Sequence, residues 1–386
     1  MRVLIVQPSL LFYGGAAAAV AQLSAHLKSR GIHNTIVTLF ATTNFMESTR
    51  DLNLDIRAKT VSTYNSVSSK DALSKRYSRF FSDVLVLRRF IAAHKNNYDL
   101  INPHNFPSNW ASVLHKKPVV WMMNEPLGIY TLPSFLPKVA SQISAKCDRF
   151  LVTNYIDKIC VNSYITQNQA KQIYGRTSNL VLFGIDYKRY RVGSPDQAYA
   201  KFGLDGRFVI LTTGVVDPWK NQLASIKAVE KVISHIPNVL LVLTGGGDKE
   251  YITMLRDYVR RKKLDPYIIF TGFLPDSDII SLYHASHIGL YPFKEQGGLL
   301  APFESLCAGK PIIISSTNGA TELIKRYKLG IVTDNYADAI IDVYNYYGRY
   351  KNMAQSAQEC VQKEFSWEKY CERLLRIFEN AYATTK

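Results

Sequence analysis

The chain has 386 residues, of which 47% are hydrophobic and 20% are charged. This length suggests two domains with ample core, and the composition is that of a globular protein rather than a disordered or fibrous one. Five cysteines without a C-x-x-C pair favour reduced thiols in a cytosolic protein over disulfide bonds or a zinc site. We expect no signal peptide and no membrane span, because the N-terminus runs straight into a strand pattern and no apolar run reaches ~18 residues.

The net charge of +16 indicates an anionic partner, such as a nucleic acid, a membrane surface or a phosphorylated ligand. No zinc finger, RNA-binding segment or recognition helix is visible, so nucleic acid is not an expected partner. Between Lys70 and Lys95, basic residues alternate with aromatic and aliphatic ones at helical spacing. Such a helix either lies on an anionic membrane or packs on the core with a solvated basic face, and the sequence leaves both interpretations open.

The first half of the chain alternates strand and helix patterns. Short continuous apolar runs are typical of parallel strands that are buried on both faces. The expected strands are Arg2–Val6, Asn34–Leu39, Leu100–Ile101, Pro118–Met122 and Lys158–Val161. A helix rich in alanine is expected from about Ala16 to Ser29, after a loop that contains Gly14 and Gly15. The first strand, this helix and the next strand form a βαβ unit, whose crossover should be right-handed.

The second half begins the same pattern again. Its expected strands are Phe208–Thr213, Val239–Thr244, Tyr267–Phe270, Ile288–Tyr291 and Ile312–Ser315, and its expected helices are Ala224–Ser234, Glu250–Lys262, Ser277–Ala285 and a terminal one up to about Tyr382. We therefore predict an α/β protein with two Rossmann-like domains that face each other across a cleft, with the ligand at the carboxyl ends of the strands. The domains are expected at residues 1–186, together with the terminal helix 366–386, and at residues 187–365.

The segment from Tyr291 to Pro311 carries the strongest functional signal. A glycine-rich loop leads there from an apolar strand into a short helix. Such a loop presents backbone N–H groups and the positive end of the helix dipole to an anion, typically a phosphate. Glu295, Gln296 and Glu304 bracket the loop, and a carboxylate at this place can accept hydrogen bonds from the hydroxyls of a sugar or a ribose.

This segment resembles the donor-site signature of the retaining glycosyltransferases of family four, which have the GT-B fold. The stretch from Glu304 to Pro311, Glu-Ser-Leu-Cys-Ala-Gly-Lys-Pro, is similar to the second half of that signature, Glu-Ala-Met-Ala-x-Gly-x-Pro. The first half departs, because eight residues before Glu304 the family has a glutamate and this chain has Gln296. Either a loop that is one residue longer lets Glu295 take the role, or Gln296 replaces the acid.

The resemblance implies a site for a nucleotide-diphosphate sugar, held without a metal or another cofactor, where positive side chains and helix N-termini stabilise the leaving diphosphate. Glu304 would bind the ribose, and Glu295 or Gln296 the transferred sugar. Lys220 lies in a segment similar to the family's Gly-Arg-Leu-x-x-x-Lys-Gly and would contact the diphosphate, although Val215 stands where the family has arginine. The other residues implied at the donor are Gly14, Gly15, Gly214, Gly298, Leu299 and Leu300, with Gly245 in a flexible turn near the base.

The first domain supplies the residues expected near the acceptor. His104 stands at a strand end where many family members have a histidine, and it is either functional or a satisfied structural histidine. A second histidine of the family is replaced by Asn124, which can hydrogen-bond to a sugar but cannot act as a general base because asparagine does not titrate near neutral pH. The adjacent Glu125 can orient an acceptor hydroxyl.

We therefore predict a cytosolic retaining glycosyltransferase, with a position at the inner face of a membrane as one interpretation of its basic surface. It would move a hexose from a UDP- or GDP-sugar to a hydroxyl of a glycan or lipid-linked acceptor, in polysaccharide assembly. The departures at Val215, Asn124 and the Glu295–Gln296 pair leave open a catalytically impaired nucleotide-sugar-binding protein of the same fold. An epimerase of nucleotide-diphosphate sugars is a further alternative, against which the match from Glu304 to Pro311 argues.

Overall fold

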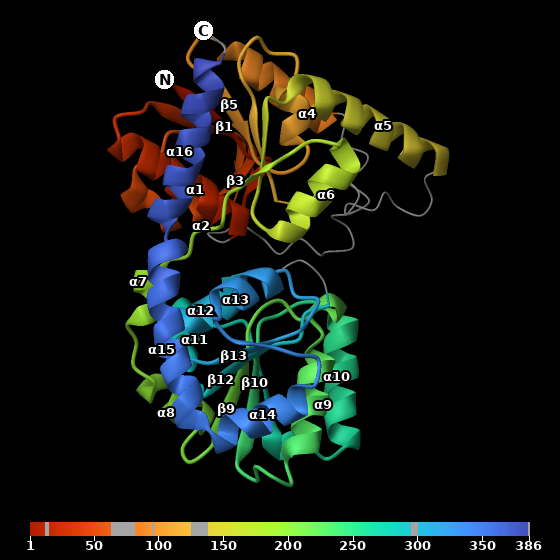
Figure 1. Ribbon diagram of the computed structural model, residues 1–386, viewed down its shortest axis with the longest axis vertical. Helices are drawn as coiled ribbons and strands as arrows, with labels where there is room; N and C mark the ends of the chain where they lie inside the picture. Colours follow the sequence, from red (N-terminus) through yellow and green to blue (C-terminus); the bar gives the residue numbers. More distant parts are fainter. Residues whose placement is uncertain (12–14, 63–81, 95, 125–137, 295–299, 385–386) are drawn as a thin grey trace. The chain divides into compact units, whose positions relative to one another are not determined.

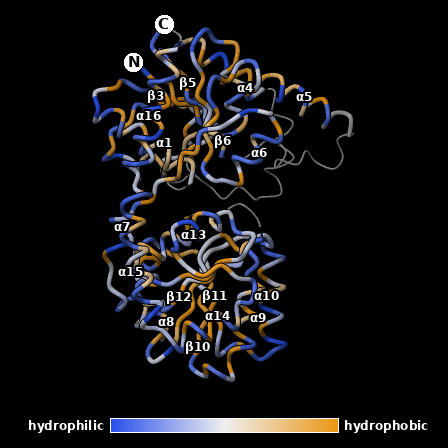
Figure 2. Tube along the Cα trace, viewed as in Figure 1, coloured by the Kyte–Doolittle hydropathy of each residue, from blue (hydrophilic) through white to orange (hydrophobic). Residues whose placement is uncertain are grey.

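The computed structural model describes residues 1–11, 15–62, 82–94, 96–124, 138–294 and 300–384. The chain forms two compact units (Figure 1). Unit 1 comprises Met1–Gly184 and Trp367–Lys386, and unit 2 comprises Ile185–Ser366, so the chain passes between the units twice. The hydrophobic residues gather along the strands in the interior of each unit (Figure 2).

Unit 1 is built on parallel strands that are buried along most of their length. They are β1 (Val3–Val6), β2 (Ser9–Leu10), β3 (Asn34–Thr42), β4 (Ile56–Ser62), β5 (Leu100–Pro103), β6 (Val120–Met123), β7 (Lys158–Val161) and β8 (Asn179–Leu180). One sheet has the order β2-β3-β1-β5 with β4 also paired to β3, and another has the order β6-β7-β8. Parallel bridges between Ile101 and Val119 and between His104 and Met122 join the two sheets side by side.

Helices cover both faces of this arrangement. They are α1 (Gly15–Ser29), α2 (Thr43–Ser48), a helix over residues 82–93, α4 (Ser108–Ser112), α5 (Lys138–Tyr155), α6 (Tyr164–Tyr174) and α16 (Trp367–Ala383), with a 3-10 turn η1 (Arg50–Leu52). One core lies between the strands and the helices α1 and α16, and includes Leu23, Leu374 and Phe378. The other core lies beneath the helix over residues 82–93 together with α5 and α6, and includes Leu87 and Val152.

Unit 2 is a single six-stranded parallel sheet in the order β11-β10-β9-β12-β13-β14. The strands are β9 (Phe208–Thr212), β10 (Val239–Thr244), β11 (Ile268–Gly272), β12 (Ile288–Tyr291), β13 (Ile312–Ile314) and β14 (Ile331–Val332). Numbered within the unit, this order is 3-2-1-4-5-6, the doubly wound order of dinucleotide-binding domains. The order reverses between β9 and β12, and this point decides where the candidate site lies.

The helices of unit 2 lie on both sides of its sheet (Figure 1). They are α7 (Tyr187–Arg191), α8 (Asp196–Phe202), α9 (Gln222–Val232), α10 (Lys249–Arg261), α11 (Asp276–Ala285), α12 (Leu300–Cys307), α13 (Thr321–Tyr327), α14 (Tyr336–Asn345) and α15 (Tyr347–Glu364), with 3-10 turns η3 (Pro218–Lys220) and η4 (Asp265–Tyr267). Gly289 lies within β12, where an added Cβ would come within 2.6 Å of Ser305 Oγ. The absence of a side chain at this position therefore lets α12 pack closely on the strand.

The sequence predicted the long buried strands better than the short ones. The expected strands Lys158–Val161, Val239–Thr244 and Ile288–Tyr291 are confirmed with these bounds. β2, β8 and β14 were not expected, because two-residue strands give almost no periodic signal, and β4 was missed because half of its residues are exposed. Of the basic segment from Lys70 to Lys95, residues 70–81 and 95 lie outside the described residues.

The packing of α16 on unit 1 can be tested through Phe378, which is fully buried between α16 and the strands. We expect Phe378→Ala to lower the free energy of unfolding of unit 1 by about 3–5 kcal/mol, because it leaves a cavity in this core. The control is Glu379→Ala, which alters an exposed neighbour on the same helix and should stay within about 0.5 kcal/mol of the wild type. Equal denaturation midpoints for the two variants would show that α16 does not stabilise the unit.

Candidate functional site

The strand order of unit 2 places a candidate site beyond the carboxyl ends of β9 and β12. In an open parallel sheet, ligands bind where the strand order reverses, because the loops from the two neighbouring strands diverge there. β9 ends at Thr212 and β12 ends at Tyr291, and the residues that follow them include Lys220 and Phe293. We call the following group the switch-point site: Thr213, Gly214, Lys220, Phe293 and Glu304, together with Tyr190 and Tyr283, whose hydroxyls donate to Glu304.

Lys220 is a buried cation at this site. It is only 5% exposed, and its Nζ lies 3.7 Å from the ring centre of Phe293 and 4.4 Å from that of Trp219. Burial lowers the pKa of Lys220 to about 8, against the opposing effect of the Glu304 and Asp217 carboxylates. Within the described part of the chain, no hydrogen bond or ion pair reaches Nζ. A buried cation without such a partner is a ready binding site for an anion.

The glycine loops after β9 and β10 pack tightly on each other. Gly245 has a φ of +107°, and a Cβ at this position would lie 2.1 Å from the carbonyl oxygen of Gly214. The Val216 N–H also donates to the Gly246 carbonyl at 3.0 Å, and the Asp248 N–H donates to the Val216 carbonyl at 2.9 Å. Glycine is therefore required at Gly245 for the close approach of the two loops, and the expected flexible turn near the base stays a prediction.

Glu304 lies at the fifth position of α12 and is partly exposed. It is therefore no helix cap, since capping residues precede the first turn. The hydroxyl of Tyr283 donates to its Oε2 at 2.6 Å, and that of Tyr190 donates to its Oε1 at 3.1 Å. Burial raises the pKa of Glu304, and these two hydrogen bonds oppose the rise because they stabilise the ionised form. Sequence reasoning missed both tyrosines, which come from α7 and α11 and share no motif with Glu304.

An exposed aromatic ring lies just beyond the carboxyl end of β11, the strand next to β10. Phe273 follows β11 and is 82% exposed. Its ring lies against the backbone of Gly246, where an added Cβ would come within 2.2 Å of Cε2. Such a ring offers a flat apolar surface for stacking, and sequence reasoning also missed it because one Phe after a strand carries no distinctive pattern.

In unit 1, His104 has no exposed surface. Its Nε2 donates to Asn102 Oδ1 at 2.8 Å, and Asn102 Nδ2 donates to the Val120 carbonyl at 2.7 Å. Burial lowers the pKa of His104 to about 3, so the imidazole is neutral near pH 7. Asn102 thus links β5 to β6 and His104 supports it, whereas Nδ1 of His104 is buried and has no hydrogen-bond partner among the described residues.

Three asparagines form a row at the carboxyl ends of β5, β6 and β7. Asn124 Nδ2 donates to Asn105 Oδ1 at 2.7 Å, and Asn162 Nδ2 donates to Asn124 Oδ1 at 3.3 Å. All three are partly exposed, and Asn105 has a φ of +58°. Amides can donate to and accept from hydroxyl groups but do not titrate, so this row can bind a sugar without transferring a proton. Asn105 and Asn162 were missed in the sequence because isolated asparagines after strands are common.

Several predicted site residues cannot be placed. Gly14, Glu125, Glu295, Gln296, Gly298 and Leu299 lie outside the described residues. Gly15 and Leu300 are described as the first residues of α1 and α12. Val215 is described and is half exposed, with no cation at its position. The structure therefore brings together Gly214, Gly245, Lys220 and Glu304 of the predicted set, all in unit 2.

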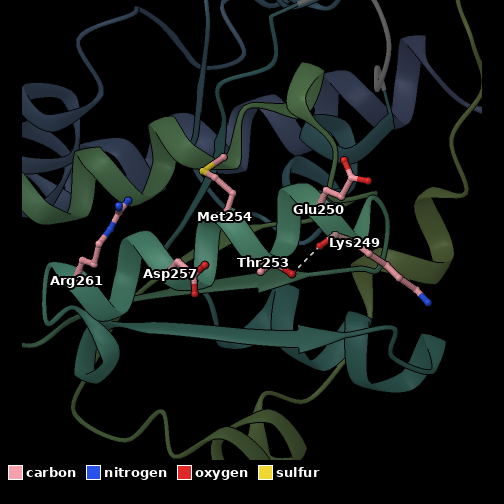
Figure 3. A pocket seen from close by; sticks show the side chains of 6 residues that line it. All are labelled: Lys249, Glu250, Thr253, Met254, Asp257 and Arg261. Carbon is pink, nitrogen blue, oxygen red and sulfur yellow. Dashed lines mark hydrogen bonds between the residues drawn. The ribbon is translucent and has the colours of Figure 1, made fainter.

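No group of three or more His, Cys, Asp or Glu side chains within the described ranges is arranged to hold a metal ion. In the same ranges, no helix combines the length and apolar character that a membrane crossing needs. A hollow of about 520 Å³ lies over α10, and Figure 3 shows that its six side chains, Lys249, Glu250, Thr253, Met254, Asp257 and Arg261, come from this helix alone. None of them belongs to the switch-point site.

Two family models match this chain, and both describe glycosyltransferases. The family described as "Glycosyl transferases group 1" matches residues 196–360, and "Glycosyltransferase Family 4" matches residues 13–189. The chain is 24% identical over 399 residues to the D-inositol 3-phosphate glycosyltransferase of Rhodococcus erythropolis, covering 98% of this chain and 89% of that protein. It is also 24% identical over 308 residues to spore coat protein SA of Bacillus subtilis, covering 74% of this chain and 79% of that protein.

A solved structure resembles the fold along nearly the whole chain. The crystal structure of HepE from Anabaena in complex with UDP has a TM-score of 0.78 at 18% identity, over 98% of this chain and 100% of that chain. The same protein in complex with UDP-glucose has a TM-score of 0.77 at 19% identity, with the same coverage. At this identity the likeness shows the fold, while the chemistry of the site has to be argued from the residues of this chain.

We expect Lys220 to bind anions best below about pH 8, where its amine is protonated. From about pH 7 to about pH 9.5, the affinity of the wild type for inorganic pyrophosphate should fall relative to that of Lys220→Arg, because arginine stays charged throughout. Lys220→Ala should lose roughly tenfold or more in affinity near pH 7. Titration calorimetry measures all three proteins, and the comparison at each pH cancels the titration of pyrophosphate itself.

Lys310 offers a matched control for this experiment. Burial also lowers its pKa to about 8, but its ammonium donates to the His284 carbonyl at 2.8 Å near the amino end of β12. Lys310→Arg should leave pyrophosphate binding and its pH dependence as in the wild type. If Lys220→Ala binds pyrophosphate as tightly as the wild type, Lys220 does not form the anion site.

Proposed function

Because the chain belongs to the group 1 glycosyltransferases of family 4 and has their GT-B fold, we propose that it transfers a hexose from a nucleotide-diphosphate sugar to a hydroxyl of a glycan or lipid-linked acceptor. The proposed transfer retains the configuration at the anomeric carbon, and UDP and GDP are the proposed carriers. UDP is supported by the neighbouring fold of HepE, which was crystallised with UDP and with UDP-glucose.

The observation that carries this proposal is the buried Lys220 ammonium at the switch point of unit 2, which has no hydrogen-bonding partner among the described residues. A departing diphosphate develops negative charge, and a fixed cation in a water-poor site stabilises that charge more strongly than water does. Lys220 would thus act on the leaving group, so no metal is required in the proposed mechanism. Phe273 would stack on the base, and Glu304 would accept hydrogen bonds from the ribose.

In this proposal, unit 1 binds the acceptor. The Asn105–Asn124–Asn162 row offers neutral hydrogen-bonding groups, which suit the hydroxyls of a sugar. Because Asn124 does not titrate and His104 is buried, neither takes the proton of the acceptor in this proposal. That proton would pass to an oxygen of the departing diphosphate, on the face of the sugar where the acceptor attacks.

The proposal predicts nucleotide-dependent stabilisation and turnover in the presence of EDTA. UDP or GDP, together with the matching sugar nucleotide, should raise the melting temperature, since ligands that bind only the folded protein stabilise it by mass action. Glu304→Ala should reduce kcat/KM by about tenfold to a hundredfold, because a hydrogen bond to a charged group is lost. The stereochemistry of the released or transferred sugar is read by NMR.

Each other outcome of this experiment selects an alternative. Stabilisation without consumption of any sugar nucleotide would identify a catalytically impaired binding protein, as the departures at Val215 and Asn124 would allow. Release of an isomerised sugar would identify an epimerase. Wild-type kinetics for Glu304→Ala would remove Glu304 from the proposed donor site.

We also propose that α5 places the enzyme on an anionic membrane surface. Ile143, Phe150 and Tyr155 of α5 are 56%, 58% and 38% exposed, and Lys146 and Arg149 are exposed beside them. Asp148, the one acidic residue in α5, is buried and accepts hydrogen bonds from Trp110 and Tyr174 instead. A helix face with exposed apolar and basic side chains and no exposed acid is typical of interfacial binding to anionic lipid.

Vesicle binding tests this surface. The wild type should bind vesicles that contain phosphatidylglycerol more tightly than vesicles of phosphatidylcholine alone. The double variant Lys146→Glu/Arg149→Glu should lose at least about tenfold in binding, since each basic residue near the surface contributes about 1 kcal/mol. Met254→Ser changes an exposed residue of α10, whose surface carries both positive and negative side chains, and should leave vesicle binding as in the wild type. Equal binding by the double variant and the wild type would contradict the proposed role of α5.

A further inference from the structure

We infer that Tyr190 and Tyr283 are positioning residues, which hold the Glu304 carboxylate in the orientation that receives the 2′- and 3′-hydroxyls of the donor ribose. This inference rests on the proposed function, which assigns the ribose to Glu304, and it adds two residues from elements that no donor motif includes. It also predicts that the pair controls the preference for ribonucleotides over deoxyribonucleotides.

Each tyrosine binds a different oxygen of the carboxylate. Tyr283, from α11, donates to Oε2 at 2.6 Å, and Tyr190, from α7, donates to Oε1 at 3.1 Å. Two donors on two oxygens fix the plane of the carboxylate, whereas a single donor would let it rotate about its terminal bond. The orientation of Glu304 is therefore set by α7 and α11 and not by α12 alone.

The two tyrosines are themselves held in place. Their rings pack edge to face, with centroids 5.6 Å apart and an interplanar angle of 87°. Tyr283 is fully buried, and the carbonyl of Tyr190 lies 3.0 Å from Nε2 of His284. An interlocked pair of this kind loses little further side-chain entropy when a ligand binds.

A third hydroxyl connects the pair to the end of β9. The hydroxyl oxygens of Thr213 and Tyr283 lie 2.8 Å apart. Because the one proton of the Tyr283 hydroxyl points to the carboxylate, Thr213 must be the donor in this contact. The chain of hydrogen bonds thus runs from Thr213 through Tyr283 to Glu304. It begins next to Gly214, beside which Lys220 lies, so the proposed ribose contact is close to the proposed diphosphate contact.

The carboxylate keeps room for two more donors. Each oxygen of an ionised carboxylate has about two acceptor positions, and one on each oxygen is occupied by a tyrosine. Glu304 is partly exposed, so a ligand can reach the remaining positions. The adjacent 2′- and 3′-hydroxyls of a ribose supply two donors at matching spacing, whereas a 2′-deoxyribose supplies one and would leave one acceptor position of the carboxylate without its partner.

The hydrogen bonds also favour the ionised form of the carboxylate. Burial raises the pKa of Glu304, and the hydroxyls of Tyr283 and Tyr190 are the main groups that oppose this rise. Without them the pKa of Glu304 would rise further, and a protonated carboxyl group binds a hydroxyl less strongly than a carboxylate does. Geometry and charge therefore both point to the same function for the two tyrosines.

The test compares UDP and GDP with their 2′-deoxy forms by titration calorimetry. The wild type should bind the ribonucleotide tighter than the deoxyribonucleotide by about tenfold or more, the usual effect of one hydrogen bond to a charged group. In Tyr283→Phe and in Tyr190→Phe, this ratio should fall by about threefold or more, while the affinity for inorganic pyrophosphate stays as in the wild type. Unchanged pyrophosphate binding shows that the variants are folded and that the diphosphate contacts remain.

Tyr258→Phe is the matched control, because the Tyr258 hydroxyl also donates to a glutamate, Glu230, at 2.6 Å, but between α9 and α10. In this variant, the ratio of the affinity for the ribonucleotide to that for the deoxyribonucleotide should equal the ratio in the wild type. The inference is overturned if Glu304→Gln lowers the ratio while both site tyrosine variants keep it, since Glu304 would then bind ribose without their help. If Glu304→Gln also keeps the wild-type ratio, or if the wild type binds neither nucleotide, the ribose assignment of the proposed function fails, and this inference fails with it.

Discussion

The chemistry of unit 2 depends on the burial of one positive charge. Moving an ammonium group out of water costs several kcal/mol even after relaxation, and each contact between a cation and an aromatic ring returns only about 0.5–2 kcal/mol. The rings of Trp219 and Phe293 therefore stabilise the Lys220 ammonium in part, while burial lowers its pKa. An anionic ligand at this place would add to that stabilisation.

The surrounding backbone follows from this constraint. Gly214 has a φ of +128°, a conformation that favours glycine, and Lys220 lies in ordinary contact distance of it. The loop after β10 can support this strand end because Gly245 and Gly247 allow backbone atoms to come close. A larger side chain at Gly245 would meet the Gly214 carbonyl, and one at Gly247 would meet the Val216 carbonyl. These glycines thus help to determine the shape of the site.

Charge is distributed differently in the two units. The switch-point site has a buried cation and a partly exposed carboxylate, which suit a ligand that carries both phosphates and hydroxyls. The described residues at the carboxyl ends of β5, β6 and β7 instead present a row of amides, which suit a neutral, hydroxyl-rich ligand. Part of the positive charge of the chain lies on the exposed face of α5, beside exposed aromatic residues.

The sequence by itself determined the alternation of strands and helices, the doubling of that pattern and the two strongest site residues, Glu304 and Lys220. Each of these is encoded locally, in a buried apolar run or in a motif that continues through one loop and one helix. Only the tertiary structure decided what surrounds them. Tyr190 is 114 positions from Glu304, and Asn162 is 38 positions from Asn124, so no local pattern links them. Tyr190 reaches Glu304 because α7 packs on α12. Asn124 and Asn162 meet because the neighbouring parallel strands β6 and β7 place their carboxyl ends at one edge of the sheet.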